Sequence, residues 1–253
     1  MTSSSKLDFF AQAVSSHHAE IPADPDDDPL ARQAAVSTAL MFVFRGKFCD
    51  VILPGRKPTT FDKHDSIYEV GDDVRTLFFL QSGFAKVGTM NLDGREVIYD
   101  VRKAGDVVGE LCAYEPARLD RAVALERTDA IGVPFEEIME VLLKSPGLVA
   151  MLIEVFCRAL KEAYGQVNTL AMDDTVRRLA KVLMGLATKL GRRSGSLVEI
   201  PTYLTQEEIA QMVAARREGV STALNCLRRQ GMVHYTNRGH LALDVGALEN
   251  AFS

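Results

Sequence analysis

The stretch LTQEEIAQMVAARREGVSTALNCLRRQGMVHYTNRGHLALD, residues 204–244, decides the fold of the C-terminal part of the chain. Thr205 followed by Glu208 is a capping box, in which the threonine hydroxyl accepts from a free backbone N–H and the glutamate reaches back to the cap. A helix is therefore expected to begin here. Its apolar stripe consists of Ile209, Met212 and Val213.

A second predicted helix follows after a tight join and has two different faces. Its apolar residues Val220, Leu224 and Leu227 can pack on the stripe of the first helix. Two short helices, a join and a basic hairpin make up a winged helix-turn-helix, a fold that binds DNA. The exposed face of the second helix carries side chains that hydrogen-bond to base edges and phosphates, namely Arg216, Arg217, Glu218, Ser221 and Thr222.

Length and composition bound the remainder of the protein. The chain has 253 residues, of which 47% are hydrophobic and 25% charged, as is typical of a soluble globular protein with one large or two ordinary domains. No run approaches the roughly 18 apolar residues of a membrane span. The N-terminus lacks the charged and apolar regions of a secretory signal. We expect a cytoplasmic protein without a membrane partner.

The net charge of −5 conceals an uneven distribution of charge. Basic residues outnumber acidic ones between Thr175 and His240, whereas the rest of the chain is strongly acidic. Such segregation is expected when one module faces phosphate and the other does not. The alternative is a positive face that is merely solvated.

The N-terminal half changes from an irregular to a periodic pattern. Residues 1–29 end in a Pro and Asp cluster and are predicted to be a flexible acidic extension, with a short helical segment around 7–14. A helix is expected over 30–44. Between Cys49 and Val133, short apolar runs alternate with turn signals, which predicts an antiparallel β jelly roll within a domain spanning 30–146.

One hairpin of this jelly roll is specified locally. The runs 84–90 and 96–101 flank Asp93-Gly94, a pair that supplies the positive φ angles of a tight turn. Other turn signals lie at 54–58, 70–73, 81–83 and 103–106.

Long helices are predicted to connect the two ends of the chain. A short helix over 135–143 and Pro146 precede a heptad seam over 149–170, which indicates a parallel homodimer. The alternative is that this stripe packs on its own barrel. Residues 147–173 are predicted to be the dimerisation helix and hinge, and residues 174–253 the DNA-binding domain. Within that domain, Asp174 is expected to cap a helix over 175–190, and a short strand is expected near 197–200. The seam consists of Val149, Ile153, Phe156, Leu160, Ala163, Val167 and Leu170.

A second motif lies inside the jelly roll. Gly109, Glu110 and Leu111 follow a turn, and Arg121 comes twelve residues after the glycine. A glycine that opens a short helix lets backbone N–H groups approach a phosphate. Arg121 can fork onto phosphate oxygens, and Glu110 can accept from a ribose hydroxyl. The alternative is that Glu110 and Arg121 serve only in structural ion pairs.

The order of these features resembles that of the cyclic-AMP receptor protein and fumarate–nitrate regulator family, over roughly residues 40–253. The segment GEL with its later arginine is similar to the family's phosphate-binding cassette, and QEEIAQMVAARREGVSTAL is similar to its helix-turn-helix. The resemblance implies an α+β protein: a jelly-roll domain of the cyclic-nucleotide-binding type, a long dimerisation helix and a winged helix-turn-helix. It implies a transcription regulator and not an enzyme.

Departures from the family's pattern leave the ligand open. Ala122 stands where cyclic-AMP-responsive members carry Ser or Thr, and Ala163 and Tyr164 stand where they carry a Thr-Ser pair. Tyr164 would either stack on a purine or fill the pocket. The ligand is accordingly expected to be a cyclic nucleotide or cyclic dinucleotide. The alternatives are a different small ligand, or a ligand-independent regulator with a vestigial cassette.

The resemblance also implies how DNA would be bound. Two recognition helices of a homodimer would lie about 34 Å apart on a near-palindromic operator. Arg217 would contact guanine and Glu218 cytosine, while Arg216, Ser221 and Thr222 would hold phosphate or tune neighbouring bases. Thr205 and the wing residues Arg238 and His240 would position the DNA backbone. An activator would also contact RNA polymerase.

Other classes of protein fit the sequence less well. Cys49, Cys112, Cys157 and Cys226 are too scattered for a local zinc or iron–sulfur motif. Neither haem nor another metal is expected, and a cupin enzyme would need more histidines in the barrel than His64. A cyclic-nucleotide-binding module that acts through protein partners would not need the basic C-terminal segment.

Overall fold

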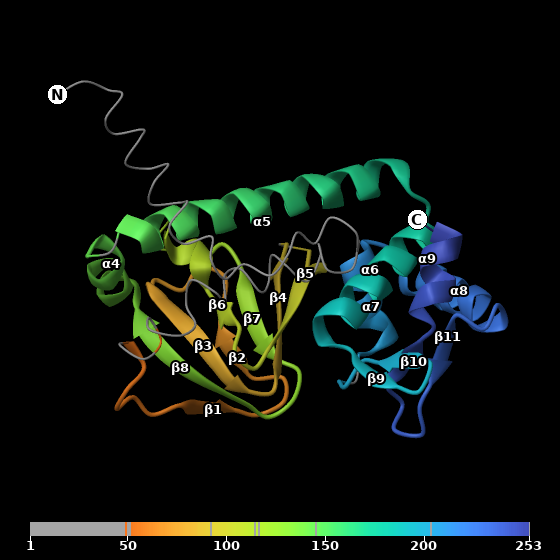
Figure 1. Ribbon diagram of the computed structural model, residues 1–253, viewed down its shortest axis with the longest axis horizontal. Coiled ribbons are helices and arrows are strands. Elements are labelled where there is room, and N and C mark those ends of the chain that lie inside the picture. Colours follow the sequence, from red (N-terminus) through yellow and green to blue (C-terminus); the bar gives the residue numbers. More distant parts are fainter. Residues whose placement is uncertain are drawn as a thin grey trace.

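The computed structural model describes Cys49 and residues 52–91, 93–113, 115, 117–144, 146–202 and 204–252. The expected acidic extension and the helices expected at 7–14 and 30–44 lie outside the described residues. Two β-sheets, a long helix above them and a compact group of helices with a small sheet follow one another along the chain (Figure 1). Within the described part, no helix is both long and apolar enough to cross a membrane.

The jelly roll predicted from the turn spacing is confirmed as two antiparallel four-stranded sheets. Their strand orders are β1-β8-β3-β6 and β2-β7-β4-β5. Apolar side chains such as Ile67, Leu80 and Val87 fill the space between the sheets. The strands are β1 (Thr59–Phe61), β2 (Ser66–Tyr68), β3 (Thr76–Ser82), β4 (Phe84–Met90), β5 (Glu96–Lys103), β6 (Val107–Val108), β7 (Arg121–Ala124) and β8 (Thr128–Pro134).

The predicted hairpin around Asp93-Gly94 is the β4–β5 pair. Its register runs from Phe84 opposite Lys103 to Met90 opposite Glu96, with an irregularity at Val87 and Gly88. Gly94 has a φ of +76°, the left-handed region that the turn requires. The hairpin forms the edge of its sheet on which the C-terminal domain lies (Figure 1).

Two helices follow the sheets. Helix α4 (Phe135–Leu143) has the predicted bounds, and α5 (Pro146–Met172) begins on Pro146, where a missing N–H costs nothing. Buried residues of α4, including Ile138 and Leu142, pack with Leu77 and Val133 of the first sheet. Helix α5 then runs over the sheets toward the C-terminal domain (Figure 1).

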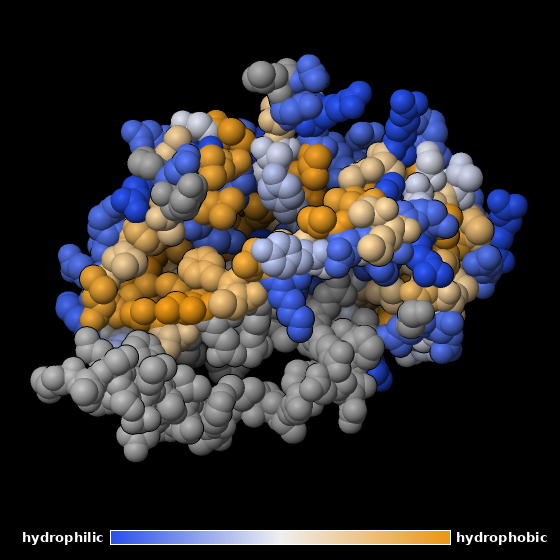
Figure 2. Space-filling view, turned by 90° about the horizontal axis from the view of Figure 1, so that it is seen from above, coloured by the Kyte–Doolittle hydropathy of each residue, from blue (hydrophilic) through white to orange (hydrophobic). Residues whose placement is uncertain are grey.

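The heptad seam of α5 is largely exposed in the single chain. Its first position, Val149, packs on the core beneath α4, so this position serves the protein's own fold. The later positions are exposed, and the view from above the molecule shows clusters of hydrophobic residues (Figure 2). The exposed fractions are 56% for Ile153, 43% for Phe156, 53% for Leu160, 60% for Val167 and 48% for Leu170.

Asp174 caps α6 as predicted, because its side chain accepts from the N–H of Arg177. The C-terminal domain contains this helix. Its four strands form a sheet in the order β11-β12-β10-β9, and its helices enclose a core around Leu183, Leu224 and Leu227. The elements are α6 (Thr175–Leu190), β9 (Arg192–Ser194), β10 (Leu197–Glu199), α7 (Gln206–Val213), α8 (Arg217–Arg229), β11 (Val233–Tyr235), β12 (Leu241–Leu243) and α9 (Val245–Phe252).

The two domains share a continuous apolar core. Val101 of β5 and Leu125 after β7 are fully buried in the same cluster as the C-terminal helices, and Phe84 of β4 packs against that cluster. Apolar burial of this kind is a major source of stability at about 25 cal/mol per Å². The C-terminal domain is therefore docked on the β4–β5 edge of the jelly roll.

Candidate ligand cassette and nucleic-acid interface

The cassette begins with a glycine that no other residue could replace without a shift. Gly109 has a φ of +89°, and a Cβ there would lie 2.7 Å from Nη1 of Arg118 and 3.0 Å from the carbonyl oxygen of Thr76. A 3-10 helix, η3 (Glu110–Ala113), follows directly. The short helix expected after the glycine is therefore present.

Glu110, the first residue of η3, points one of its oxygens at an arginine. Oε1 accepts from Nη2 of Arg102 at 3.1 Å, while the buried Oε2 has no hydrogen-bond partner among the described residues. A buried carboxylate oxygen without a partner carries a desolvation cost of about 1–3 kcal/mol. One oxygen of Glu110 is therefore paired with Arg102, and the other can accept from a further donor.

Arg121 opens strand β7 and lies between two carboxylates. Nη2 donates to Oε1 of Glu69 at 2.9 Å, and Nη1 lies 3.9 Å from Oε1 of Glu96. Its Nε is buried and has no partner among the described residues. The guanidinium therefore combines an ion pair with one unused donor.

The other predicted cassette residues take different positions. Ala122 is completely buried between the sheets, where a larger polar side chain would face apolar neighbours. Leu111 is 41% exposed and Tyr164 of α5 is 62% exposed. Tyr164 therefore does not fill the interior of its own barrel, one of the two roles considered for it.

Arg118, which was not among the predicted residues, lies at the centre of the cassette. Its side chain is buried, Nη1 donates to the carbonyl of Gly109 at 2.7 Å, and Nη2 donates to the carbonyl of Thr76. Its guanidinium carbon lies 4.2 Å from the ring centre of Tyr68. The signal was a second arginine three residues before Arg121, in the segment ARLDRA.

Arg118 belongs to a buried polar group inside the barrel. The hydroxyl of Tyr68 donates to Oδ2 of Asp120 at 3.1 Å. Burial raises the pKa of Asp120, and Glu110 adds to the effect. Burial likewise raises the pKa of Tyr68. The interior next to Gly109 is therefore polar and charged rather than apolar.

A second charged group lies where β5, α5 and α6 meet. Nζ of Lys189 lies 2.5 Å from Oδ2 of Asp100, and Nε of Arg102 lies 2.9 Å from the same oxygen. Burial opposes ionisation of Asp100, but Lys189 and Arg102 hold its pKa below the usual value. Burial, with Asp100 adding to it, raises the pKa of Glu162 on α5 to about 7.

The helix-turn-helix has the geometry expected from its capping box. Oγ1 of Thr205 accepts from the N–H of Glu208, and Oε2 of Glu208 accepts from the N–H of Thr205 at 2.9 Å. Helix α7 ends at Val213, and its C-cap Ala214 has a left-handed φ of +52° that turns the chain toward α8. Glu208, whose carboxylate closes the cap, is buried.

Helix α8 presents the predicted recognition residues to solvent. Arg216 is its N-cap and Arg217 its first residue, and both are exposed, as is Glu218. No side chain caps this helix. Oγ1 of Thr222 donates to the carbonyl of Glu218 at 2.9 Å, which leaves the hydroxyl oxygen free to accept, and Ser221 lies half-buried on the same helix.

The wing lies between β11 and β12. Arg238 is exposed at its tip, whereas Nδ1 of His240 lies 2.9 Å from Oε1 of Glu199 on β10. Thr205 is half-buried at the start of α7. Of the residues expected to contact the DNA backbone, Arg238 is therefore the most accessible, and His240 has a partner within its own domain.

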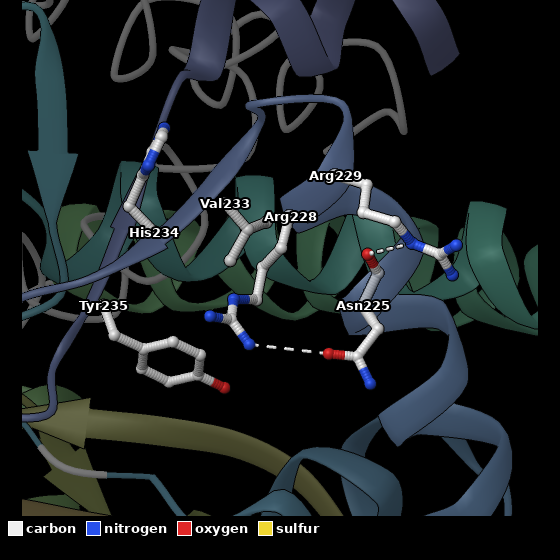
Figure 3. Close-up of a pocket in the computed structure, with 6 residues that line it drawn as sticks. All are labelled: Asn225, Arg228, Arg229, Val233, His234 and Tyr235. Carbon is white, nitrogen blue, oxygen red and sulfur yellow. Dashed lines mark hydrogen bonds between the residues drawn. The ribbon is translucent and has the colours of Figure 1, made fainter.

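A basic hollow lies between the end of α8 and β11, with a volume of about 750 Å³ (Figure 3). Nη1 of Arg228 reaches Oδ1 of Asn225 at 3.5 Å, and its guanidinium carbon lies 5.2 Å from the ring centre of Tyr235. Nε of Arg229 donates to the carbonyl of Asn225 at 3.3 Å. The lining contains no carboxylate; it consists of Asn225, Arg228, Arg229, Val233, His234 and Tyr235.

The side chains that could bind a metal are spread out in the described part of the chain. No group of three or more His, Cys, Asp or Glu side chains there is arranged to hold a metal ion. Cys112, Cys157 and Cys226 are not joined in disulfides.

Comparison with known families divides the chain in two. Residues 58–145 match the family model of the cyclic nucleotide-binding domain. Residues 177–251 match the model of the Crp-like helix-turn-helix domain. The two matches cover the cassette and the recognition helix respectively.

Similar proteins of known role are transcription regulators. The chain is 28% identical over 189 residues to the "CRP-like cAMP-activated global transcriptional regulator" of Mycobacterium tuberculosis, covering 74% of this chain and 84% of that protein. It is 25% identical over 186 residues to the "Anaerobic regulatory protein" of Bacillus subtilis, covering 72% and 77%. The structure of FixK2 from Bradyrhizobium japonicum superposes with a TM-score of 0.69 and 19% identity, covering 78% of this chain and 98% of that one.

Proposed function

Because this chain belongs to the cyclic-AMP receptor protein and fumarate–nitrate regulator family of DNA-binding transcription regulators, we propose that it acts as a homodimer whose binding to a near-palindromic operator is controlled by a small anionic ligand. The observation that carries the proposal is the exposed, uncapped start of α8 with Arg216, Arg217 and Glu218. We further propose that residues 30–146 form the sensor domain and 174–253 the DNA-binding domain, joined by a dimerisation helix and hinge at 147–173.

The exposed seam of α5 supports the homodimer. Isolated exposed apolar residues are common on protein surfaces, but a row of them at heptad spacing along one helix is typical of an interface. A second copy of α5 would cover Ile153, Phe156, Leu160 and Val167 with the same residues. The recognition helices of the pair would then enter successive major grooves about 34 Å apart.

The cassette supports a cyclic nucleotide or cyclic dinucleotide as the ligand. Arg121 would bind the phosphate, and the unpartnered Oε2 of Glu110 would accept from a ribose hydroxyl. The Mycobacterium tuberculosis relative is named as cAMP-activated. Ala122 lacks the hydroxyl found in cyclic-AMP-responsive members, which removes a hydrogen bond worth about 0.5–1.5 kcal/mol. The identity of the base therefore rests on residues outside the cassette, with Tyr164 as the candidate.

A second candidate function is a ligand-independent regulator. The observation that favours it is that Arg121 already pairs with Glu69, and Glu110 with Arg102. In this case both cassette residues would serve the fold, and DNA binding would respond to protein abundance alone.

One experiment separates the two candidates. A gel-shift selection of bound DNA, with and without a panel of cyclic nucleotides and dinucleotides, identifies the operator and any ligand dependence together. Ligand control predicts a shift in operator affinity with at least one nucleotide. The same operator affinity with every member of the panel would favour the ligand-independent regulator.

Replacing Arg121 with alanine should abolish the nucleotide response of operator binding. The guanidinium makes the charge-assisted contacts to phosphate, and such contacts contribute about 1.5–3 kcal/mol each. The measurement is a nucleotide titration of operator binding by fluorescence anisotropy. Arg127→Ala, an exposed arginine just beyond β7, serves as the matched control. A full response in the Arg121 variant would remove this residue from ligand binding.

We propose that the basic hollow at the end of α8 holds a backbone phosphate of the bound duplex. Arg229→Gln should lower affinity for operator and non-specific duplex alike and should reduce the slope of log K against log salt by about 1. The check is a set of binding curves at several salt concentrations, with Arg56→Gln, an arginine of the sensor domain, as control. An unchanged slope would place the hollow away from the duplex.

A further inference from the structure

Two chains of ion pairs connect the cassette to the DNA-binding domain. The first starts at Arg121, whose Nη1 lies 3.9 Å from Oε1 of Glu96 on β5. Oε2 of Glu96 lies 3.1 Å from Nζ of Lys86 on β4, and Nζ also lies 3.6 Å from Oε1 of Glu208 on α7. Glu208 is the residue that closes the capping box of the helix-turn-helix with Thr205.

The second chain starts at the other cassette residue. Glu110 pairs with Arg102 at 3.1 Å, and Arg102 pairs with Asp100 at 2.9 Å. Asp100 then pairs at 2.5 Å with Lys189 in the last turn of α6. Nζ of Lys103 also donates to the carbonyl of Lys189 at 2.5 Å. Both chains cross the β4–β5 hairpin and end on the domain that carries α8.

These charges lie in a poorly hydrated layer. The side chains of Arg121, Glu96, Lys86 and Glu208 retain only 18%, 14%, 12% and 10% of their exposure. Solvent and salt screen buried charges much less than exposed ones. A change in the charge or position of one member therefore alters the pairing of the next.

Nζ of Lys86 lies within ion-pair distance of two carboxylates. Glu96 belongs to the sensor domain and Glu208 to the DNA-binding domain, and the lysine lies nearer to Glu96. Arg121 offers Glu96 a second cation. A group that binds Arg121 and moves it from Glu96 leaves Lys86 as the remaining cation near Glu96. The Lys86–Glu96 ion pair is then strengthened, and the Lys86–Glu208 contact is weakened.

We propose that Glu96 and Lys86 are positioning residues that couple occupation of Arg121 by an anionic ligand to the hold of the sensor domain on helix α7. An anion on Arg121 weakens the Lys86–Glu208 contact, so the DNA-binding domain is released from the β4–β5 edge. The role of this coupling in ligand-controlled DNA binding rests on the proposed function, but the coupling itself can be tested without DNA or ligand.

The test is amide hydrogen exchange of α7, measured by mass spectrometry on the full-length protein. Arg121→Gln should speed exchange over Gln206–Val213, because it frees Glu96 to compete for Lys86. Glu96→Gln should slow it, because Lys86 is then left to Glu208. Coupling through such networks typically changes an equilibrium by about 2- to 30-fold, and this is the change expected in each exchange rate.

The opposite signs make the test independent of damage to the fold, because general destabilisation speeds exchange and cannot slow it. In the double variant Arg121→Gln/Glu96→Gln, the effect of the arginine should disappear. Lys86→Arg should preserve the pattern, since the charge is kept. Asp93→Asn, an exposed carboxylate on the same hairpin, should change nothing.

Two results would overturn the coupling. One is faster exchange of α7 in Glu96→Gln, and the other is an Arg121→Gln effect that persists undiminished in the double variant. Failure of the full-length protein to bind any duplex in a gel shift would instead refute the proposed function. Because exchange is recorded without DNA, the two failures are distinguishable.

Discussion

Replacement of Arg217 by alanine is expected to cost about 1–3 kcal/mol of operator affinity while leaving binding to non-specific duplex almost unchanged. The loss corresponds to roughly 5- to 150-fold in the dissociation constant. Arg217 is the first residue of α8 and is exposed, so its planar fork can reach the two acceptors on a guanine edge. Loss of base readout affects only the sequence that carries that guanine.

The measurement is fluorescence anisotropy with the selected operator and a scrambled duplex at one fixed salt concentration, because phosphate contacts make all affinities salt-dependent. Arg216→Ala is the matched control: the neighbouring arginine is expected to hold phosphate, so its loss should weaken both duplexes equally. Arg217→Lys keeps the charge and removes the fork, and it should behave like alanine on the operator. Equal losses on both duplexes for Arg217→Ala would exclude base readout by this residue.

Replacement of Leu160 by glutamate is expected to raise the dissociation constant of the dimer at least about 100-fold. Truncation of one buried leucine costs about 2–5 kcal/mol, a symmetric interface loses two of them, and the new carboxylates would be desolvated. Leu160 is 53% exposed in the single chain, so the protomer itself should still fold. Operator affinity should fall with dimerisation, because each protomer then binds one half-site alone.

Sedimentation velocity over a concentration series provides the measurement, with far-UV circular dichroism to verify the fold. Gln166→Glu adds the same charge to α5 outside the seam and should leave the dimer intact. If Leu160→Glu sedimented as a dimer at the same concentrations as the unchanged protein, the seam of α5 would not be the interface.

Local signals in the sequence were sufficient to predict many elements. The bounds of α4 and α6 follow from apolar spacing and from Asp174, an N-cap whose effect is confined to the first turn. The Thr205–Glu208 capping box and the Asp93-Gly94 turn act over three or four residues in the same way. Each of these features is decided by interactions between close neighbours in the chain, so each is visible without a structure.

The partners of the cassette residues could not be predicted in this way. Arg121 meets Glu69 and Glu96, and Lys86 meets Glu208, through pairings that bridge long stretches of chain. Periodicity specifies which face a side chain occupies, but not which charge lies opposite. Arg118 was missed for the same reason, since its partners are the backbone carbonyls of Gly109 and Thr76.

Because the start of α8 is uncapped, we expect DNA binding to order this helix. The first backbone N–H groups of a helix lack internal partners and carry partial positive charge, yet α8 begins with Arg216 and Arg217 and has no side-chain cap. Glu218 is the acidic residue of its first turn. We therefore expect the first turn to fray in the free protein, and DNA phosphates would supply the anions that complete it. The duplex would then supply the cap that this helix lacks.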